Sequence, residues 1–389
     1  MRAGPCWHSA CCSAPSRIDP VVGYRIAMVG ACPYPVPQGS QVYLKDTALA
    51  LKRYGHEVRL VVYGHAFGPD SGGLTLHRGV RLPLVNRTAA GPSLVKPLLD
   101  LDLVFTLRCV VRNERIEIVH THNYEALLVA LAAGCRPIVY HAHNAMSDEL
   151  PYFFPGSGLV GRAGAWIDRT FPRRADHTIV PHDRLGQYLV ECGCETDRVT
   201  TVEPAADVGM FDPCETSHGT PPVLYAGNLD AYQNLDLLAR AMKRVRRTVP
   251  TVEFLVATHQ RRPVEGATII TIDSPAGLHR AMSIEAVFAC PRVSWSGYPI
   301  KLLNAMSAAM AVVACESAAY PLTHEHDGLI VPDDDEAAFA DALIRLIDDP
   351  ELRRRLGRNA RDTVTKRHRP EQTAQRISEV YARVMATVS

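Results

Sequence analysis

The sequence predicts an α/β protein built from two Rossmann-like, doubly wound parallel-sheet domains that face a cleft. Short apolar segments alternate with segments of helical periodicity along most of the chain, as is typical of parallel sheets covered by helices. A polar stretch at 212–220 separates two such series. The length of 389 residues also suits two domains, at roughly 100–200 residues each. Ligands of such sheets bind at the carboxyl ends of the strands, so we expect the site in the cleft.

The first series follows a leader and fills the first half of the chain. Residues 1–23 contain no continuous apolar segment, which argues against a secretory signal and predicts a disordered leader. The domain that follows is expected at 24–207, with a helix at 42–54 that Gly55 ends. Its expected strands are 25–30, 56–62, 116–119, 138–140 and 177–180.

The second series predicts a domain at 208–368. A further helix follows Pro370, and the segment 369–389 is a candidate to cross back onto the first domain. The expected strands are 223–226, 252–257, 268–272, 286–290 and 311–314, and the expected helices are 235–247, 299–310, 335–348, 351–365 and 371–385.

Composition argues against several classes of protein. The 42 Lys and Arg residues against 41 Asp and Glu residues give a formal charge of +1, whereas a nucleic-acid binder needs a basic surplus. No apolar segment approaches the roughly 20 residues of a membrane span. The 11 cysteines form no C-x-x-C pair, so structural zinc is not expected, and we interpret them as reduced thiols of a cytoplasmic protein.

The first strand is followed by a loop that opens a helix. A dinucleotide-binding protein would carry G-x-G-x-x-G there, but the next glycine after Gly30 is Gly39, which argues against a nicotinamide dehydrogenase. The loop instead brings Gly39 and Ser40 to a helix start, where backbone N–H groups can hold an anion or a sugar hydroxyl. A plain loop with a helix cap fits these residues equally well.

Histidines follow two strands at the edge that faces the cleft. His143 and Asn144 come directly after one strand, and His120 and His122 stand at the end of the strand before it. A neutral imidazole there can hydrogen-bond a sugar or orient a leaving group. Metal binding is the competing hypothesis, but H-x-H lacks a carboxylate at ligand spacing, and we predict no metal. For His120 and His141 we expect burial and hydrogen bonds to backbone carbonyls.

The segment 294–306 is the most informative for chemistry. Gly297 loosens a loop, and Pro299 suits the first turn of a helix. Lys301 lies just inside that helix and shares a face with Asn304. A helix N-terminus that faces the cleft offers unpaired N–H groups and a partial positive charge, so the segment predicts a binding site for a diphosphate. An amphipathic helix with a solvated lysine is the alternative.

Together these motifs resemble the GT-B glycosyltransferases, most nearly the retaining transferases of glycosyltransferase family 4. Within that family the sequence looks similar to the sugar transferases of antibiotic or aminoglycoside type. The resemblance runs from about residue 24 to the C-terminus. It implies the GT-B fold, a nucleotide-diphosphate-sugar donor, transfer with retention, and no required metal or other cofactor. It rests on the Gly39-Ser40 loop, the His143-Asn144 pair and the segments 225–229, 296–306, 326–331 and 349–352.

The resemblance also implies roles for single residues. Lys301 and the backbone of Gly297 and Tyr298 would hold the diphosphate, and His143 would contact the transferred sugar near the reacting carbon. Lys301 and His143 are therefore the expected catalytic residues, with no protein base needed. The expected donor-binding residues are Gly39, Ser40, Gly227, Asn228, Gln233, Ser296, Gly297, Tyr298 and Asn304.

Four positions depart from the family pattern. The family usually shows a Glu-x7-Glu pair, whose positions match Ser296 and Asn304, and tends to place an arginine and a lysine where this chain has Asn228 and Gln233. The donor phosphates thereby lose two cations, which leaves Lys301 and the helix N-terminus. The losses suit either an altered donor site or a protein that binds a nucleotide sugar without transfer, and we favour the altered site.

Acidic residues in the first-domain loops suggest an acceptor. Glu125, Asn144, Asp148 and Glu149 form the expected acceptor side, and carboxylates there suit a cationic, hydroxyl-rich molecule. The main prediction is therefore transfer of a hexose from an NDP-sugar, with UDP expected, to a small polar acceptor such as an aminocyclitol or aminoglycoside intermediate of antibiotic biosynthesis. Solvated surface acids explain the same residues at least as well.

A lipid-linked acceptor, such as a phosphoinositide or a polyprenyl-linked sugar, is the alternative. The segment 162–174 combines basic and aromatic residues that could touch an anionic membrane. It is short and also contains Asp168 and Pro172, so membrane contact is not favoured.

Overall fold

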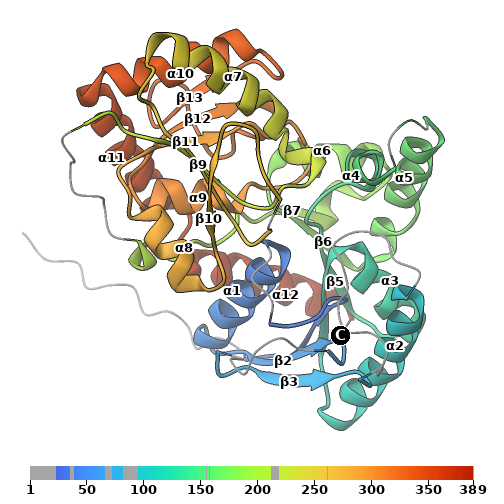
Figure 1. Ribbon diagram of the computed structural model, residues 1–389. Helices are drawn as coiled ribbons and strands as arrows, with labels where there is room; N and C mark the ends of the chain where they lie inside the picture. The colour runs from blue at the N-terminus through green and yellow to red at the C-terminus, as the bar shows by residue number, and fades with distance from the viewer. Residues whose placement is uncertain are drawn as a thin grey trace, which may run out of the picture.

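The computed structural model describes residues 23–35, 39–65, 72–81, 95–154, 156, 158–211, 219–260 and 262–388. The predicted leader lies outside these residues except for Gly23, and so does most of the polar stretch at 212–220. Two parallel sheets, one in each half of the chain, organise the described residues (Figure 1). The two-domain α/β architecture predicted from the sequence is confirmed.

The first sheet has seven strands in the order β3-β2-β1-β4-β5-β6-β7, and every neighbouring pair is parallel. The five predicted strands are present, and the edge strands β3 and β7 were not predicted because they are short and only partly buried. The strands are β1 (Arg25–Gly30), β2 (Glu57–Val62), β3 (Thr75–Arg78), β4 (Ile118–His122), β5 (Ile138–His141), β6 (His177–Val180) and β7 (Val199–Thr201).

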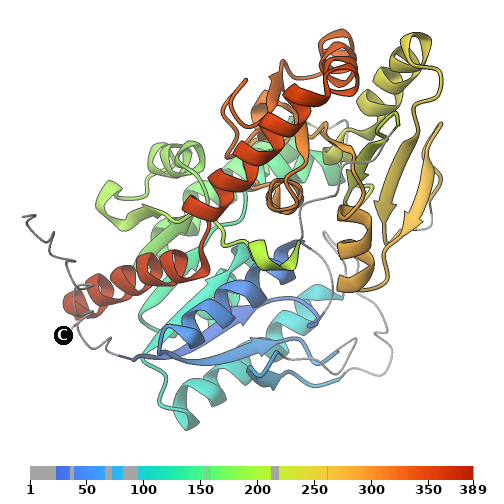
Figure 2. The same ribbon diagram turned by 90° about the vertical axis from the view of Figure 1, so that its left-hand side faces the viewer.

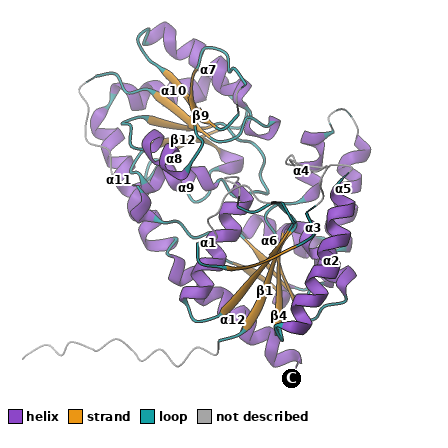
Figure 3. Cartoon of the chain, turned by 60° about the horizontal axis from the view of Figure 1, so that its bottom comes forward, coloured by secondary structure: helices purple, strands orange, loops and turns teal. Residues whose placement is uncertain are grey.

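Helices cover both faces of this sheet, as Figure 3 shows. α1 (Gly39–Arg53) packs on one face, and α2 (Lys96–Asn113), α3 (Asn123–Ala133) and α6 (Asp183–Glu191) pack on the other. A further pair of helices, α4 (Met146–Phe153) and α5 (Gly158–Thr170), packs together after β5.

The last helix, α12 (Pro370–Val388), returns to the first domain and packs beside α1 (Figure 2). Its apolar residues recur at helical spacing and enter the same core as Leu44 and Leu51 of α1. No described helix, α12 included, is long and apolar enough to cross a membrane. The α12 residues in this core are Ala374, Ile377, Val380, Tyr381 and Val384.

The second sheet has six parallel strands in the order β10-β9-β8-β11-β12-β13. Its strands are β8 (Val223–Ala226), β9 (Phe254–Thr258), β10 (Thr268–Thr271), β11 (Val287–Cys290), β12 (Ala311–Cys315) and β13 (Leu329–Val331). The helices α7 (Leu235–Thr248) and α10 (Glu336–Asp348) cover one face, α8 (Pro275–Met282) and α9 (Ile300–Ser307) cover the other, and α11 (Pro350–Arg367) contributes to both cores.

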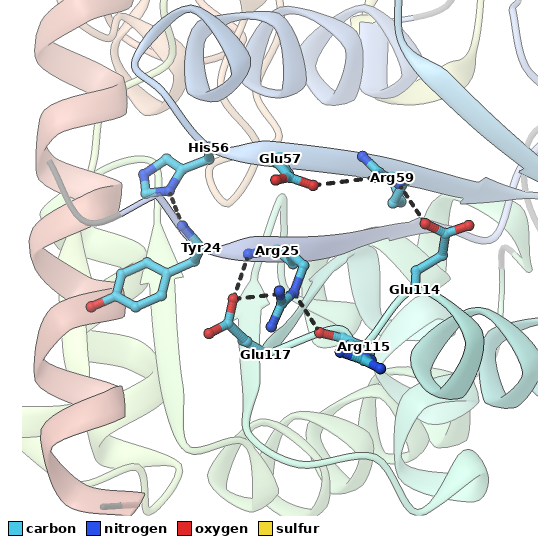
Figure 4. A network of polar contacts seen from close by, with 8 residues as sticks. All are labelled: Tyr24, Arg25, His56, Glu57, Arg59, Glu114, Arg115 and Glu117. Carbon is cyan, nitrogen blue, oxygen red and sulfur yellow. Dashed lines mark hydrogen bonds and ion pairs between the residues drawn. The ribbon is translucent and has the colours of Figure 1, made fainter.

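Ion pairs and hydrogen bonds close the amino-terminal edge of the first sheet (Figure 4). The backbone N–H of Arg25 donates to the Glu117 carboxylate at 2.9 Å, and Nε of Arg59 donates to Glu114 at 3.1 Å. Partly exposed pairs near the surface, such as Arg59 with Glu114, contribute little stability each. Their effect is to satisfy the polar groups at this edge, while the site lies at the opposite, carboxyl edge.

Candidate active site

A cavity of about 580 Å³ lies between the two domains. Its walls include the residues that directly follow β1 and β8, together with the loops after β5 and β11, so it occupies the carboxyl ends of strands from both sheets. Gly39 is the first residue of α1, beside Ser40. The predicted site residues that line the cavity are Ser40, Glu125, His143, Asn144, Glu149, Gly227, Asn228, Gln233, Gly297, Tyr298 and Lys301.

Asp148 and Ser296 pair with each other across the domains. The Asp148 carboxylate, on α4, accepts hydrogen bonds from Ser294 Oγ at 2.8 Å, from Ser296 N–H at 3.1 Å and from Ser296 Oγ at 2.6 Å. Nδ1 of His182 accepts from the Leu185 N–H, so Nε2 carries the proton and donates to the Ser296 carbonyl at 3.0 Å. We call Asp148, His182, Ser294 and Ser296 the interdomain clasp.

The clasp contains two of the predicted site residues. Asp148 was expected on the acceptor side and Ser296 among the donor-binding residues; in the structure each side chain is engaged by the other, and Ser296 is fully buried. Asn304 is also absent from the described cavity wall, because it lies one helical turn beyond Lys301 on α9. The structure therefore does not bring these three residues together with the rest of the predicted site.

Lys301 lies at the start of α9 and faces the cavity. Burial lowers the pKa of its ammonium to about 8, and the Asp46 carboxylate on α1 counteracts part of this shift. Within the described ranges, no carboxylate lies at ion-pair distance from its Nζ. Lys301 is thus a mostly protonated cation beside a helix N-terminus, an arrangement suited to an anionic group.

Arg292, which is not among the predicted site residues, lines the same cavity. Its Nε and Nη2 donate to the carbonyl and hydroxyl oxygens of Ser294, both at 3.2 Å. Its Cζ lies 5.1 Å from the ring centroid of Tyr232, which is also a lining residue. The available signal was its position, two residues after the buried strand β11, where parallel sheets place their ligand contacts.

The loop that opens the second domain presents amides to the cavity. Nε2 of Gln233 donates to Asn228 Oδ1 at 2.9 Å. Nδ2 of Asn228 donates in turn to Asp230 Oδ2 at 2.6 Å and to Tyr232 Oη at 2.7 Å. Amide groups both donate and accept, so this wall suits the hydroxyl groups of a nucleotide or a sugar.

Four buried histidines lie close together at the carboxyl edge of the first sheet. Alternate residues of β4 share a face, and His141 of β5 pairs in register with His122, so three of the rings meet on one face. Burial lowers the pKa of all four, to about 3 for His120 and His143, which keeps the imidazoles neutral at pH 7. We call His120, His122, His141 and His143 the histidine layer.

A chain of hydrogen bonds runs through this layer from α12 to the cavity. Tyr381 Oη lies 2.6 Å from His120 Nδ1, and His120 Nε2 lies 3.2 Å from His141 Nδ1. His141 Nε2 then lies 2.8 Å from the hydroxyl of Tyr43, a cavity residue. His120 and His141 are buried as expected, but they bond tyrosines and each other instead of backbone carbonyls, because α1 and α12 cover this face with tyrosine side chains.

The same layer is the place where the described residues could accommodate a metal ion. His120, His122 and His141 bring one ligand nitrogen each within 4.8 Å of the others. However, both nitrogens of His120 and of His141 already have hydrogen-bond partners. The ring nitrogens of His120 and His141 are therefore already engaged in the hydrogen-bonded chain.

His143 faces the cavity with its tautomer set by His122. Nδ1 of His122 lies 2.9 Å from Nε2 of His143, and His122 Nε2 has no partner among the described residues. A buried N–H group without a hydrogen-bond partner is less tolerated than a buried acceptor without one. We therefore infer that His122 carries its proton on Nδ1 and donates a hydrogen bond from it to Nε2 of His143. His143 then carries its own proton on Nδ1, and its ring stacks on Tyr43 with centroids 4.7 Å apart.

The acidic groups of the first-domain wall have partners within the protein. Lys96 Nζ lies 2.8 and 3.0 Å from the two carboxylate oxygens of Glu125. Asn144 Nδ2 donates to the Glu149 carboxyl, whose pKa burial raises to about 7. With Asp148 bonded to the serines of the clasp, each of these three carboxyl groups already has a hydrogen-bond partner within the protein.

Two family models match the chain, one in each domain. The model described as "Glycosyl transferase 4-like domain" matches residues 38–205, and the model described as "Glycosyl transferases group 1" matches residues 220–349. Together they span both sheets and the cavity between them.

Known glycosyltransferases are similar in sequence over most of the chain. A D-inositol 3-phosphate glycosyltransferase of Saccharomonospora viridis is 26% identical, over 93% of this chain and 94% of that protein. A phosphatidyl-myo-inositol mannosyltransferase of Mycolicibacterium smegmatis is also 26% identical, over 85% of this chain and 86% of that protein.

Solved structures share the fold at lower sequence identity. The sucrose-phosphate synthase of Thermosynechococcus elongatus superposes with a TM-score of 0.80 at 18% identity, over 94% of this chain and 100% of that one. The Anabaena protein HepE, solved in complex with UDP-glucose, gives 0.69 at 16% identity, over 92% and 99%. The chain therefore belongs to the GT-B glycosyltransferases of family 4, which are retaining hexosyltransferases.

Proposed function

We propose that the protein transfers a hexose from a nucleotide-diphosphate sugar, with UDP as the nucleotide, to a hydroxyl of an inositol phosphate. The names of the two relatives give inositol 3-phosphate and phosphatidyl-myo-inositol, and each relative aligns over most of its length. A structural neighbour holds UDP-glucose, which supports the donor class. The antibiotic intermediate favoured by the sequence analysis has no support among these relatives.

The charge of the first-domain wall is the observation that carries the choice of acceptor. A cationic aminocyclitol would need unpaired carboxylates, but Glu125 is paired with Lys96 and Asp148 bonds the opposite domain. Glu149 is close to half protonated at pH 7, because burial raises its pKa to about 7. Such a wall suits the hydroxyl groups of a neutral ring.

The donor end of the cavity follows from α9 and the loops opposite it. In this proposal Lys301 and the backbone of Gly297 and Tyr298 hold the diphosphate, while Gly39 and Ser40 close over it from the first domain. Asn228 and Gln233 contact the nucleotide or sugar hydroxyls. Support comes from the position of these side chains around one cavity, apart from Gly39, which adjoins it in sequence.

Transfer with retention can proceed without a protein base. The bond between the anomeric carbon and the diphosphate oxygen breaks, the acceptor oxygen bonds the same face of that carbon, and the acceptor proton goes to the departing diphosphate. Lys301 and the α9 N-terminus stabilise the charge that develops on the leaving oxygen. His143 donates a hydrogen bond from its neutral ring to the transferred sugar, with Asn144 beside it.

Product analysis by mass spectrometry tests this function. We would incubate the protein with UDP-glucose, UDP-N-acetylglucosamine or GDP-mannose, each with inositol 3-phosphate, phosphatidylinositol vesicles or 2-deoxystreptamine. We expect a hexosyl adduct of the inositol phosphate or of phosphatidylinositol. Adducts of the aminocyclitol alone would contradict the proposal, and donor binding without any adduct would favour a non-catalytic binder.

One surface feature favours the lipid-linked form of this acceptor as a second candidate. The helix α5 exposes Leu159 and Trp166, at 71% and 60%, and carries Arg162 and Arg169. Apolar side chains interleaved with arginines suit the surface of an anionic membrane. Pelleting with phosphatidylinositol vesicles in low and high salt separates the two forms. Salt-sensitive pelleting that Trp166→Ser weakens supports the lipid, whereas full retention in the supernatant supports the free acceptor.

A further inference from the structure

Arg292 is a half-buried cation on the wall of the cavity that the expected mechanism does not use. Two of its N–H groups are satisfied by Ser294, so the side chain is held in place by its own loop. In the part of the chain that the structure describes, no carboxylate lies within ion-pair distance of the guanidinium. A guanidinium carries five N–H donors, so the cavity receives donors beyond those that Ser294 engages. Its positive charge partly counteracts the effect of burial on the pKa of Glu149, a carboxyl of the same cavity, but forms no ion pair with it.

The guanidinium lies against the turn that leads into α9. A side-chain carbon placed on Gly297 would approach Nη2 of Arg292 to 2.3 Å, so the arginine packs directly on the backbone of this glycine. Lys301, four residues further on, lines the same cavity. The turn is thus flanked by two cations, and its helix adds the partial positive charge of an N-terminus.

The other neighbours of Arg292 fix its direction without reducing its charge. Its Cζ lies over the ring of Tyr232 at 5.1 Å, and the Tyr232 hydroxyl accepts from Asn228 at 2.7 Å. Arginine stacks on aromatic faces and binds phosphate through two parallel N–H groups. The arginine and lysine that the family tends to place at 228 and 233 are amides here, and Arg292 brings a cation to the same wall.

We propose that Arg292 binds the donor diphosphate through its free N–H groups and stabilises it as the leaving group. This inference rests on the proposed function in requiring a nucleotide-diphosphate donor, but not on the identity of the acceptor. When the bond to the anomeric carbon breaks, negative charge grows on the phosphate oxygens, and the hydrogen bonds from the guanidinium strengthen. The second cation of the site thus comes from the end of β11.

Calorimetry with UDP and with uridine tests this assignment, because only UDP carries the diphosphate. Arg292→Gln keeps a donor for Ser294 but removes the charge. Arg292→Lys keeps the charge but loses the two parallel N–H groups of the guanidinium. We expect Arg292→Gln to weaken UDP binding at least tenfold and uridine binding less than twofold, with Arg292→Lys in between. Arg240→Ala, which removes a surface cation paired with Glu336, serves as the control with unchanged binding.

The outcomes separate this inference from the proposed acceptor. Unchanged UDP affinity in Arg292→Gln, or an equal loss for UDP and uridine, would overturn the phosphate role. The melting temperature of each variant is measured in parallel, and Arg292→Lys supplies the same comparison if the glutamine variant melts early. A selective loss of UDP affinity supports the inference even if no inositol adduct forms, since donor binding needs no acceptor.

Discussion

Lys301 is the residue on which the donor site depends most. Its ammonium stays largely protonated at pH 7 although burial lowers its pKa to about 8, and no described carboxylate pairs with it. We predict that Lys301→Ala raises the donor KM and lowers kcat at least tenfold, about 1.4 kcal/mol in the barrier. Steady-state kinetics with UDP-glucose measure both constants. Lys243→Ala, at an exposed ion pair with Glu265, is the matched control, and wild-type kinetics for Lys301→Ala would remove Lys301 from the mechanism.

Glu149 makes the stability of the protein depend on pH in a predictable direction. Burial raises the pKa of its carboxyl from 4.5 to about 7, so the folded state binds a proton that the unfolded state releases. This contribution to stability is complete below pH 4.5 and is lost as the pH rises through 7. We predict that wild type loses about 2–3 kcal/mol relative to Glu149→Gln between pH 5 and pH 8.

Urea unfolding of both proteins at the two pH values measures this difference. Parallel stability curves for wild type and Glu149→Gln would show that the carboxyl titrates at its usual pKa and that the wall is more acidic than we infer.

The residues show how far a sequence alone could specify the site. Residues that follow predicted strands or start the helix near 300, such as His143, Asn228 and Lys301, do line the cavity. Asp148 and Ser296 were assigned from their neighbours in sequence, yet each is engaged by a partner in the opposite domain. A local sequence pattern does not encode a contact between residues that are so far apart along the chain. For the same reason the pairing of Lys96 with Glu125 could not be predicted.

At the scale of elements, β4 and β5 place a neutral histidine layer under α1. Below pH 6.5 the histidines bind protons in the unfolded chain but stay neutral in the folded protein, where burial lowers their pKa. The free energy of unfolding therefore falls as the pH drops. The expected loss is up to about 1.4 kcal/mol per pH unit for each histidine. We predict that between pH 7 and pH 5 the free energy of unfolding of His120→Gln depends less steeply on pH than that of wild type. The difference in slope corresponds to the uptake of about one proton fewer on unfolding.

Denaturant unfolding at several pH values gives the proton uptake. His326→Gln, at an exposed histidine, is the control and leaves the slope as in wild type. An unchanged slope in His120→Gln would mean that this ring is protonated in the folded protein.

Element lengths explain which parts of the sheets were predictable. The central strands are buried apolar segments, and their periodicity is visible in the sequence. The edge strands β3 and β7 have four and three residues and only partial burial, so they leave no distinct apolar pattern. α12 was predictable as a helix, but its packing beside α1 depends on a core more than 300 residues earlier in the chain.

At the scale of the whole molecule, the clasp connects the two domains at the loop that opens α9. The Asp148 carboxylate accepts three hydrogen bonds from Ser294 and Ser296, so removing it frees that loop from the first domain. We predict that Asp148→Ala enlarges the radius of gyration in solution and weakens UDP binding several-fold. Small-angle X-ray scattering and calorimetry measure these effects.

Asp341→Ala, at an exposed contact with Arg244, is the control for Asp148→Ala. If Asp148→Ala keeps both the wild-type radius of gyration and the wild-type UDP affinity, the clasp does not hold the domains together.

A crystal structure with UDP bound tests the central claim most directly, because it locates the diphosphate relative to α9. We predict that the phosphate oxygens lie within hydrogen-bond distance of Lys301 Nζ and of the backbone N–H groups at the Gly297–Tyr298 turn, on the cavity side. A diphosphate bound elsewhere, with Lys301 and the start of α9 facing solvent, would contradict the account.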